Sequence, residues 1–322
     1  MVPVVRLKEF SMQKIEKEKS DLIWRLKGIA IFTVFFAHVP YNGPYEWISY
    51  IYNLLGMLGV PSFLILSGFF DYNNSTNLIK TARNLFVPVL IWGLISYFLA
   101  NYISLLSLHV QVLDVLKWIY GCGSWLYFVP VLFWCKILSR CFDRYYYILL
   151  LISLMSIYLT ADSKNIIPYN EYFTAYTNPF NFYVYFQTGR IIRQNNIELL
   201  SVKLFLMSLA VCIISLCAWS ETPSYFSLYS VVVSICSFVV LYRIAYHIKY
   251  GEEVGKLSYV IYLVHLVPAS ILNRHGQIIF GAWFEYLKVP LIFFLILIVV
   301  WIGKLLLQQM HNVKLYKYLG YR

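Results

Sequence analysis

The chain has 322 residues, of which 60% are hydrophobic and only 13% are charged. Ordinary soluble domains are about 45–50% apolar and 25% charged, so this composition excludes a soluble globular protein and indicates one that crosses a membrane several times. The net charge of +11 then reflects which loops carry the cations, and it does not indicate nucleic-acid binding. The six cysteines have no metal-ligand spacing, so neither a disulfide framework nor a metal site is predicted.

Apolar windows of about 17 to 25 residues predict membrane-spanning helices, and ten such windows follow one another along the chain. They lie at 22–40, 47–70, 85–106, 120–139, 145–160, 178–194, 203–220, 225–247, 256–273 and 285–307. Polar residues interrupt the sixth window, namely Asn178, Asn181, Gln187 and Arg190. Barrel strands would show short segments of alternating polarity instead. The predicted fold is therefore an all-α integral membrane protein, a bundle of about ten transmembrane helices.

The basic residues predict how this bundle is oriented. If the N-terminus is cytoplasmic, all but four of the 26 Lys and Arg residues fall on the cytoplasmic side or its boundary, as the positive-inside rule requires. The four exceptions are Lys117, Lys164, Arg274 and Lys288. Ten spans also return the C-terminus to the cytoplasm. We expect a cytoplasmic segment at 1–20, a ten-helix membrane domain at 21–310 and a cytoplasmic tail at 311–322, with the longest external connection at about 161–177.

Two ionisable residues occupy the first predicted span. Lys27 and His38 are eleven positions apart, which is close to three helical turns and about 16 Å along a helix, so they share one helix face. An ionisable group inside a membrane helix is costly, and function is the default interpretation. Two structural alternatives remain: Lys27, with Arg25, is a positive-inside anchor, and His38 caps the C-terminal end of its helix.

The second span ends in a segment of small and polar residues, from Gly59 to Phe69, which includes Ser67. Each of these residues is explained individually by close helix packing or by a kink. Lys80 and Arg83 follow in the next cytoplasmic turn. They either orient the chain or bind phosphate groups by charge and paired hydrogen bonds, and their position does not separate these alternatives.

The ninth span begins with a helix-spaced series of polar residues. Tyr259, Tyr262 and His265 are three positions apart, so they lie along one side of a helix, next to Ser258. His265 is expected to be buried near the middle of the membrane. The alternative is a structural histidine that is hydrogen-bonded to a neighbouring helix.

Taken together, these motifs resemble the membrane-bound acyltransferase-3 family. Its members have ten helices, a basic residue and a histidine spaced as Lys27 and His38, a segment running from Gly-Val to Ser-Gly-Phe in the second helix, and a late Ser-Tyr-x-x-Tyr-Leu-x-His segment. The segment Gly123 to Phe128 also looks like a family motif. The resemblance covers residues 20–310. Family members usually have Arg where this chain has Lys27, and more Arg around Lys80 and Arg83.

The resemblance implies transfer of an acyl group, most simply acetyl, from cytoplasmic acetyl-CoA or another acyl-CoA to a sugar hydroxyl of a cell-surface or lipid-linked glycan. An imidazole with a pKa of about 6.5 suits removal of a hydroxyl proton at neutral pH, and His38 is the expected base or transient acyl carrier. Lys27, Lys80 and Arg83 are expected to bind the CoA phosphates. His265 is the second expected catalytic residue. Together with Ser258, Tyr259 and Tyr262 it is expected to orient His38 or to donate to the developing oxyanion, and Ser67 is a further supporting residue.

The expected location is the bacterial cytoplasmic (inner) membrane, as a multi-pass protein in contact with membrane lipid. Acyl-CoA is a co-substrate, and no bound cofactor is expected. Two other functions fit part of the pattern. A transporter or flippase for a lipid-linked sugar or small solute would also need intramembrane histidines and cations. A glycan polymerase or ligase would be expected to have a larger external loop.

Overall fold

The structure is a computed structural model that describes residues 3–72, 77–101, 111–122, 125–162, 175–217, 226–281, 283–310 and 313–321. All regular structure in these residues is helical, which confirms the all-α class. The helices are α1 (Pro3–His38), α2 (Glu46–Gly56), α3 (Gly59–Asp71), α4 (Leu78–Ala100), α6 (Val112–Tyr120), η1 (Trp125–Tyr127), α7 (Phe128–Cys141), η2 (Asp143–Tyr145), α8 (Tyr146–Asp162), α9 (Phe180–Gln194), α10 (Val202–Cys217), α11 (Leu228–His247), α12 (Glu252–Val264), α13 (Leu266–Phe280), α14 (Phe284–Gln309) and α15 (Val313–Tyr318).

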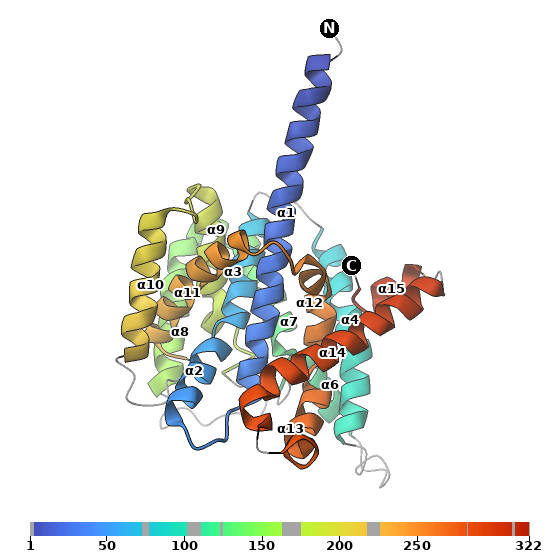
Figure 1. The fold of residues 1–322 in the computed structure, drawn as a ribbon. Coiled ribbons are helices and arrows are strands. Elements are labelled where there is room, and N and C mark those ends of the chain that lie inside the picture. Colours follow the sequence, from blue (N-terminus) through green and yellow to red (C-terminus); the bar gives the residue numbers. More distant parts are fainter. Residues whose placement is uncertain are drawn as a thin grey trace.

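The helices pack into a bundle, and the N-terminal part of α1 projects from one end of it (Figure 1). We call this the proximal end and the opposite one the distal end. With 36 residues, α1 extends about 54 Å at roughly 1.5 Å per residue, so it is longer than a bilayer core. The expected N-terminal segment and the first predicted span are therefore one continuous helix over the described residues. Helices α10 and α11 form the side of the bundle farthest from α15 (Figure 1).

Five candidate membrane spans lie among the described residues, or up to seven if each bent helix pair is one span. The five correspond to the second, third, fifth, eighth and tenth predicted spans; they are Glu46–Asp71, Leu78–Ala100, Asp143–Ala161, Leu228–His247 and Phe284–Gln309. The fourth and ninth predicted spans are the pairs α6 with η1–α7 and α12 with α13, bent by 58° and 76°. A multi-span membrane protein is thus supported, whereas ten spans and cytoplasmic termini stay predictions. The expected external connection at 161–177 lies mostly outside the described residues.

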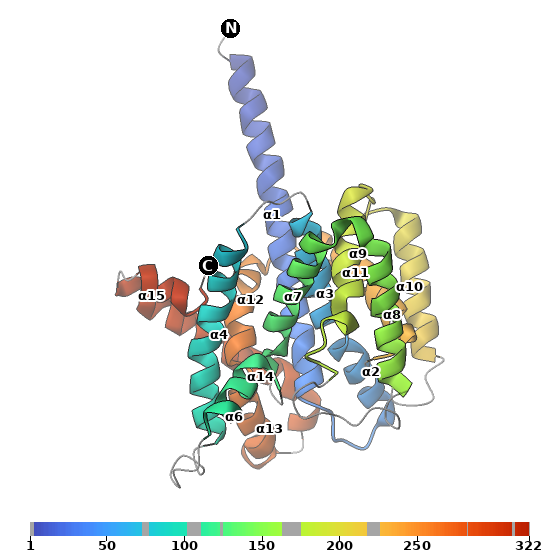
Figure 2. The same cartoon turned by 180° about the vertical axis from the view of Figure 1, so that it is seen from behind.

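The remaining predicted spans differ from simple membrane helices for identifiable reasons. The apolar part of α1 also contains Asp21, Arg25 and Lys27. Helix α10, the seventh span, has only 16 residues. Helix α9, the sixth span, has 15 residues and is mostly buried, because it lies between α3, α7 and α8 (Figure 2).

The polar residues of α9 face protein instead of lipid. Asn181 donates to the Ala175 carbonyl at 2.9 Å and accepts from Ser156 at 2.6 Å. The Tyr183 hydroxyl donates to Gln187 at 3.2 Å. Intramembrane polar groups are tolerated when they pair inside the bundle, so the polar residues that weakened the sixth window indicate a central helix.

A buried acidic residue connects α3 to α7. The Asp71 side chain is 2% exposed, and its Oδ1 atom lies 2.7 Å from Lys136 Nζ and 3.4 Å from an Arg140 guanidinium nitrogen. Nearby, Arg190 of α9 donates to the Ser139 carbonyl at 3.2 Å. Since a buried charge is tolerated only when it is paired, Asp71 helps to hold these helices together.

Two glycines allow α1 and α12 to touch along their proximal halves. A Cβ atom at Gly255 would overlap the carbonyl oxygen of Trp24, and one at Gly28 would lie 3.1 Å from the Gly251 carbonyl oxygen. Small residues are the usual means of close backbone approach between membrane helices. The two helices run in the same direction from this contact, and it sets their register.

Replacing Asp71 by Ala is expected to lower the free energy of unfolding by about 3 kcal/mol, because it leaves Lys136 and Arg140 partly buried without their carboxylate. Thermal unfolding in one detergent measures this loss. The control is Asp114→Ala, whose carboxylate is 50% exposed and 3.8 Å from Lys117 Nζ; it is expected to cost less than about 1 kcal/mol. Equal losses in the two variants would contradict the structural role of Asp71.

Replacing Gly255 by Ala is expected to force α1 and α12 apart and to cost about 1–3 kcal/mol, as overpacking does. The matched control is Gly303→Ala in α14, because a Cβ there meets only the end of the Tyr321 side chain. Thermal unfolding is measured for both. A Gly255 variant as stable as the control would show that this contact does not set the register.

Candidate active site

Residues from all three sequence motifs line one cavity. Lys27 comes from α1, Ser67 from α3, and Ser258, Tyr259 and Tyr262 from α12. The cavity measures about 100 Å³, whereas pockets for drug-sized ligands are about 300–1,000 Å³. It is therefore smaller than a pocket that would enclose a whole drug-sized ligand. Apolar side chains complete the wall, among them Val34, Val60, Phe63, Leu85, Phe128, Val129 and Leu132.

The α1 side of this cavity leads to His38. Lys27 and Val34 both line the cavity, and His38 follows Val34 by four residues. Positions spaced by seven and then four residues lie on the same helix face, which agrees with the face predicted for Lys27 and His38. His38 itself is half-buried and lies one turn beyond the residues that line the cavity.

The α12 side leads in the same way to His265. Tyr262 lines the cavity, and His265 is the next residue along that side of the helix, with no exposed surface. His38 and His265 are each ten residues beyond the glycine contact, at Gly28 and Gly255 respectively. The register of α1 and α12 thus brings the two rings together, with their centroids 5.0 Å apart.

His265 occupies the break between α12 and α13. Pro268 has no backbone N–H for the carbonyl of Val264, so the helix cannot continue straight through this point. The chain bends by 76°, although His265 N still donates to the Ile261 carbonyl at 3.0 Å. Broken membrane helices place polar groups at buried sites, and here the break places His265 beside His38.

The surroundings of His265 define its protonated nitrogen. His265 Nδ1 lies 2.7 Å from the Tyr262 carbonyl oxygen, and a carbonyl can only accept, so Nδ1 carries the proton. His265 Nε2 is then an acceptor, and it is buried without a hydrogen-bond partner among the described residues. In the neutral form with this tautomer, His265 Nε2 accepts a hydrogen bond and does not donate one.

The predicted cations divide between two cavities. Lys27 shares the first with Lys256, and its ammonium lies 4.3 Å from the centre of the Trp24 ring. Lys80 and Arg83 line a separate cavity of about 380 Å³ together with Lys314 and Lys317. The two cavities adjoin across α4, because Leu85 lines the first and Val87 and Pro88 line the second.

The C-terminal segment completes the second cavity. Tyr318 accepts a hydrogen bond of 3.0 Å from Arg83, Trp92 donates to the Leu319 carbonyl at 3.0 Å, and Tyr321 donates to the Val300 carbonyl at 3.1 Å. From the sequence, residues 311–322 are expected only to form a cytoplasmic tail, in which Lys314 and Lys317 follow the positive-inside rule. The sequence gives no indication of the contact between Arg83 and Tyr318, because they are 235 residues apart along the chain.

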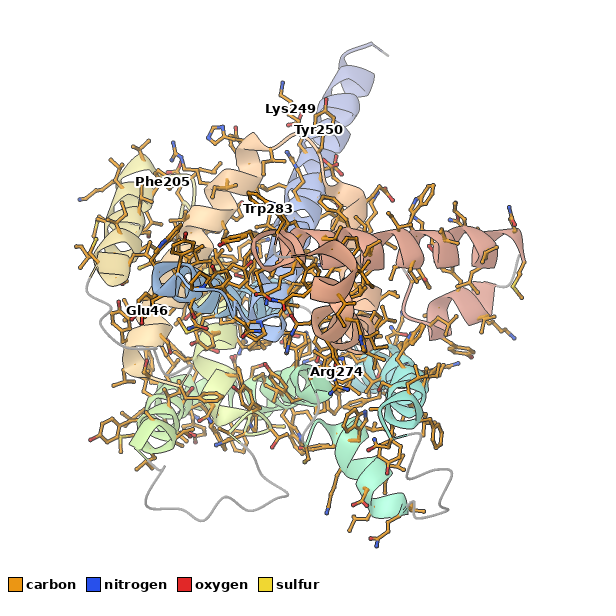
Figure 3. All side chains as sticks on the ribbon, turned by 60° about the horizontal axis from the view of Figure 1, so that its bottom comes forward. Glu46, Phe205, Lys249, Tyr250, Arg274 and Trp283 are labelled. Atoms are coloured by element: carbon orange, nitrogen blue, oxygen red, sulfur yellow. The ribbon has the colours of Figure 1, made fainter. Side chains whose placement is uncertain are left out.

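The described turn before α12 also belongs to the proximal end. Figure 3 shows Lys249 and Tyr250 beside the projecting part of α1. Arg25 donates to the Ile248 carbonyl, and its Nε lies 3.4 Å from a carboxylate oxygen of Glu252. The mouth of the first cavity is therefore held by contacts between α1 and the start of α12.

Comparison with known protein families tests the resemblance. A family model described as an acyltransferase domain matches residues 25–307, which includes every motif residue placed above. No curated protein and no solved structure shows a significant match to the chain. The match covers most of the chain and all of the candidate site, and the protein belongs to the acyltransferase-3 family of membrane acyltransferases.

Proposed function

We propose that the protein transfers an acetyl group from acetyl-CoA to a sugar hydroxyl of a cell-surface or lipid-linked glycan. The observation that carries this proposal is the alignment of the first cavity, which Lys27 and Tyr262 line, with the pair of histidines one turn beyond it on α1 and α12. Membership in the acyltransferase-3 family supports acyl transfer. The acetyl donor, the glycan acceptor and the roles of individual residues belong to the proposal.

The donor enters from the proximal end. This end carries Lys27 and Lys256 at one cavity and Lys80, Arg83, Lys314 and Lys317 at the other. Phosphate groups are bound by such clustered cations. The lining of the first cavity runs from Lys27 and Lys256 to Tyr262, and along this line an extended pantetheine arm would carry the thioester toward the histidines. By the positive-inside rule this end faces the cytoplasm, where acyl-CoA is present.

The acceptor hydroxyl meets the thioester at His38. His38 takes the hydroxyl proton as the oxygen attacks the carbonyl carbon, the carbon–sulfur bond then breaks, and the proton passes to the departing CoA sulfur. His38 is the better base of the two histidines for an external acceptor because it is half-buried, whereas His265 is fully buried. The adjacent ring of His265, fixed by the Tyr262 carbonyl, orients His38.

Transport of a lipid-linked sugar is less well supported. Intramembrane histidines and cations fit a transporter equally, but the family assignment favours acyl transfer. Glycan polymerisation has no specific support from the described residues.

Replacing His38 by Ala is expected to lower the rate of acetyl transfer by about 10²–10⁴-fold, the usual contribution of a general base. The measurement follows radiolabel from acetyl-CoA into glycans of membranes that contain matched amounts of each protein. The control is His275→Ala, which removes an exposed histidine of α13. Undiminished transfer by a folded His38 variant would exclude it as the base.

Replacing Arg83 by Ala is expected to raise the KM for acetyl-CoA roughly tenfold with little change in kcat, since a charge-assisted hydrogen bond contributes about 1.5–3 kcal/mol and a partly exposed one lies at the lower end. The control is Arg144→Ala, an exposed cation of η2 outside both cavities. A lower kcat with an unchanged KM would show that Arg83 does not bind the donor.

A further inference from the structure

Two buried polar atoms beside the histidine pair have no hydrogen-bond partner among the described residues. They are Trp125 Nε1 and His265 Nε2, on residues whose exposures are 4% and 0%. Leaving a buried donor or acceptor unpaired costs about 1–3 kcal/mol, so such atoms call for an explanation. These two atoms belong to rings in edge-to-face contact, with centroids 6.2 Å apart and planes at 73°.

Trp125 is held rigidly from several sides. It begins η1, at the bend between α6 and α7. Its backbone carbonyl accepts a hydrogen bond from the Tyr262 hydroxyl, which links it to the same residue that fixes His265. Its ring packs edge-on against Trp118, at 5.7 Å between centroids. Packing therefore fixes the orientation of the indole ring, and the N–H cannot reorient toward another acceptor.

The indole N–H groups of two nearby tryptophans do have hydrogen-bond acceptors. Trp118 Nε1 donates to the Ser96 hydroxyl at 3.1 Å, and Trp92 Nε1 donates to a backbone carbonyl. Trp125 lies between Trp118 and His265 without an equivalent acceptor. Of these three indoles, only that of Trp125, which packs against His265, has an unpaired N–H.

The two unpaired atoms are complementary to an acyl-transfer reaction. An indole N–H can only donate, and neutral His265 Nε2 can only accept when Nδ1 is protonated. When an alcohol attacks a thioester, negative charge develops on the carbonyl oxygen, and a fixed donor in a dry site stabilises it. His38 takes the proton as the base, and Nε2 of neutral His265 can only accept, so neither ring supplies an N–H to the oxyanion as the alcohol attacks.

We propose that the Trp125 indole N–H donates a hydrogen bond to the carbonyl oxygen of the acyl group and stabilises the oxyanion during transfer. This inference rests on the proposed acyltransferase function. As the acceptor oxygen bonds to the carbonyl carbon, the carbonyl electron pair moves onto the oxygen, and it returns when the carbon–sulfur bond breaks. Trp125 keeps its proton throughout, so the proton balance described for His38 is unchanged.

The decisive variant replaces Trp125 by 3-benzothienylalanine, which keeps the bicyclic shape and has sulfur in place of the N–H. The kcat for acetyl transfer is expected to fall about 10²–10³-fold, as it does when one oxyanion donor is removed elsewhere, with the KM for acetyl-CoA unchanged within about twofold. The same replacement at Trp118 is the matched control, since the Trp118 N–H donates a hydrogen bond to the Ser96 hydroxyl. It is expected to change kcat by less than about threefold.

A second measurement does not depend on turnover. Indole ¹⁵N–¹H resonances are recorded with CoA and with the ketone analogue of acetyl-CoA in which a methylene replaces the thioester sulfur. The Trp125 proton is expected to move downfield with the ketone and not with CoA, because only the ketone presents a carbonyl oxygen. The Trp118 resonance should stay in place.

The outcomes separate the two proposals. Transfer by the wild type with no loss in the Trp125 isostere and no ketone-specific shift overturns the role of Trp125 and leaves the acyltransferase function standing. Absence of transfer by the wild type to any glycan counts against the proposed function, and the ketone-specific shift then decides for or against the carbonyl contact alone. Equal kinetic losses at Trp118 and Trp125 would show a packing effect and overturn the inference.

Discussion

The contact between α1 and α12 is the constraint on which the candidate site depends. Because Gly28 and Gly255 have no side chains, the two helix backbones meet at the proximal end. They then run in the same direction, and ten further residues on each bring His38 and His265 to within 5.0 Å between ring centroids. A helix rises about 1.5 Å per residue, so a shift of one residue in either helix would separate the rings along the bundle axis.

The second constraint is that polar side chains buried in an apolar bundle need hydrogen-bond or ion-pair partners. Asp71 pairs with Lys136 and Arg140, and fully buried Lys288 lies 2.7 Å from Glu285, which also accepts from Gln277 and from the backbone of Asn42. These groups are satisfied by protein partners, as stability in a medium without water requires. Among the described residues, seven buried polar side-chain atoms have no hydrogen-bond partner. Those of Trp125 and His265 are the two whose rings pack against each other beside His38.

In the proposed function, the donor phosphates and the reacting carbonyl are bound at different places in the bundle. Cations gather at the proximal end in two adjoining cavities, whereas the histidines and Trp125 lie beyond Tyr262, in a setting of aromatic rings. Phosphate binding tolerates a wet, mobile surface because charge acts over several ångströms, but oxyanion stabilisation requires a fixed donor in a dry site. The C-terminal segment contributes to the first task and is absent from the second.

The sequence by itself determined the membrane class, the helical fold and the spacing of Lys27, His38, Tyr259, Tyr262 and His265 on two helix faces, because hydropathy and helical periodicity are local properties. Because hydropathy is local, the polar residues of α9 made it a poor candidate for a membrane span. The bend at His265 was not predicted either, although Pro268 indicates a break in the helix at that point. Only the tertiary structure decided that the two faces meet in register, that Lys80 and Arg83 join Lys314 and Lys317 away from Lys27, and that the Trp125 N–H is unpaired. Those results depend on contacts between residues far apart in the chain, which spacing along one helix does not encode.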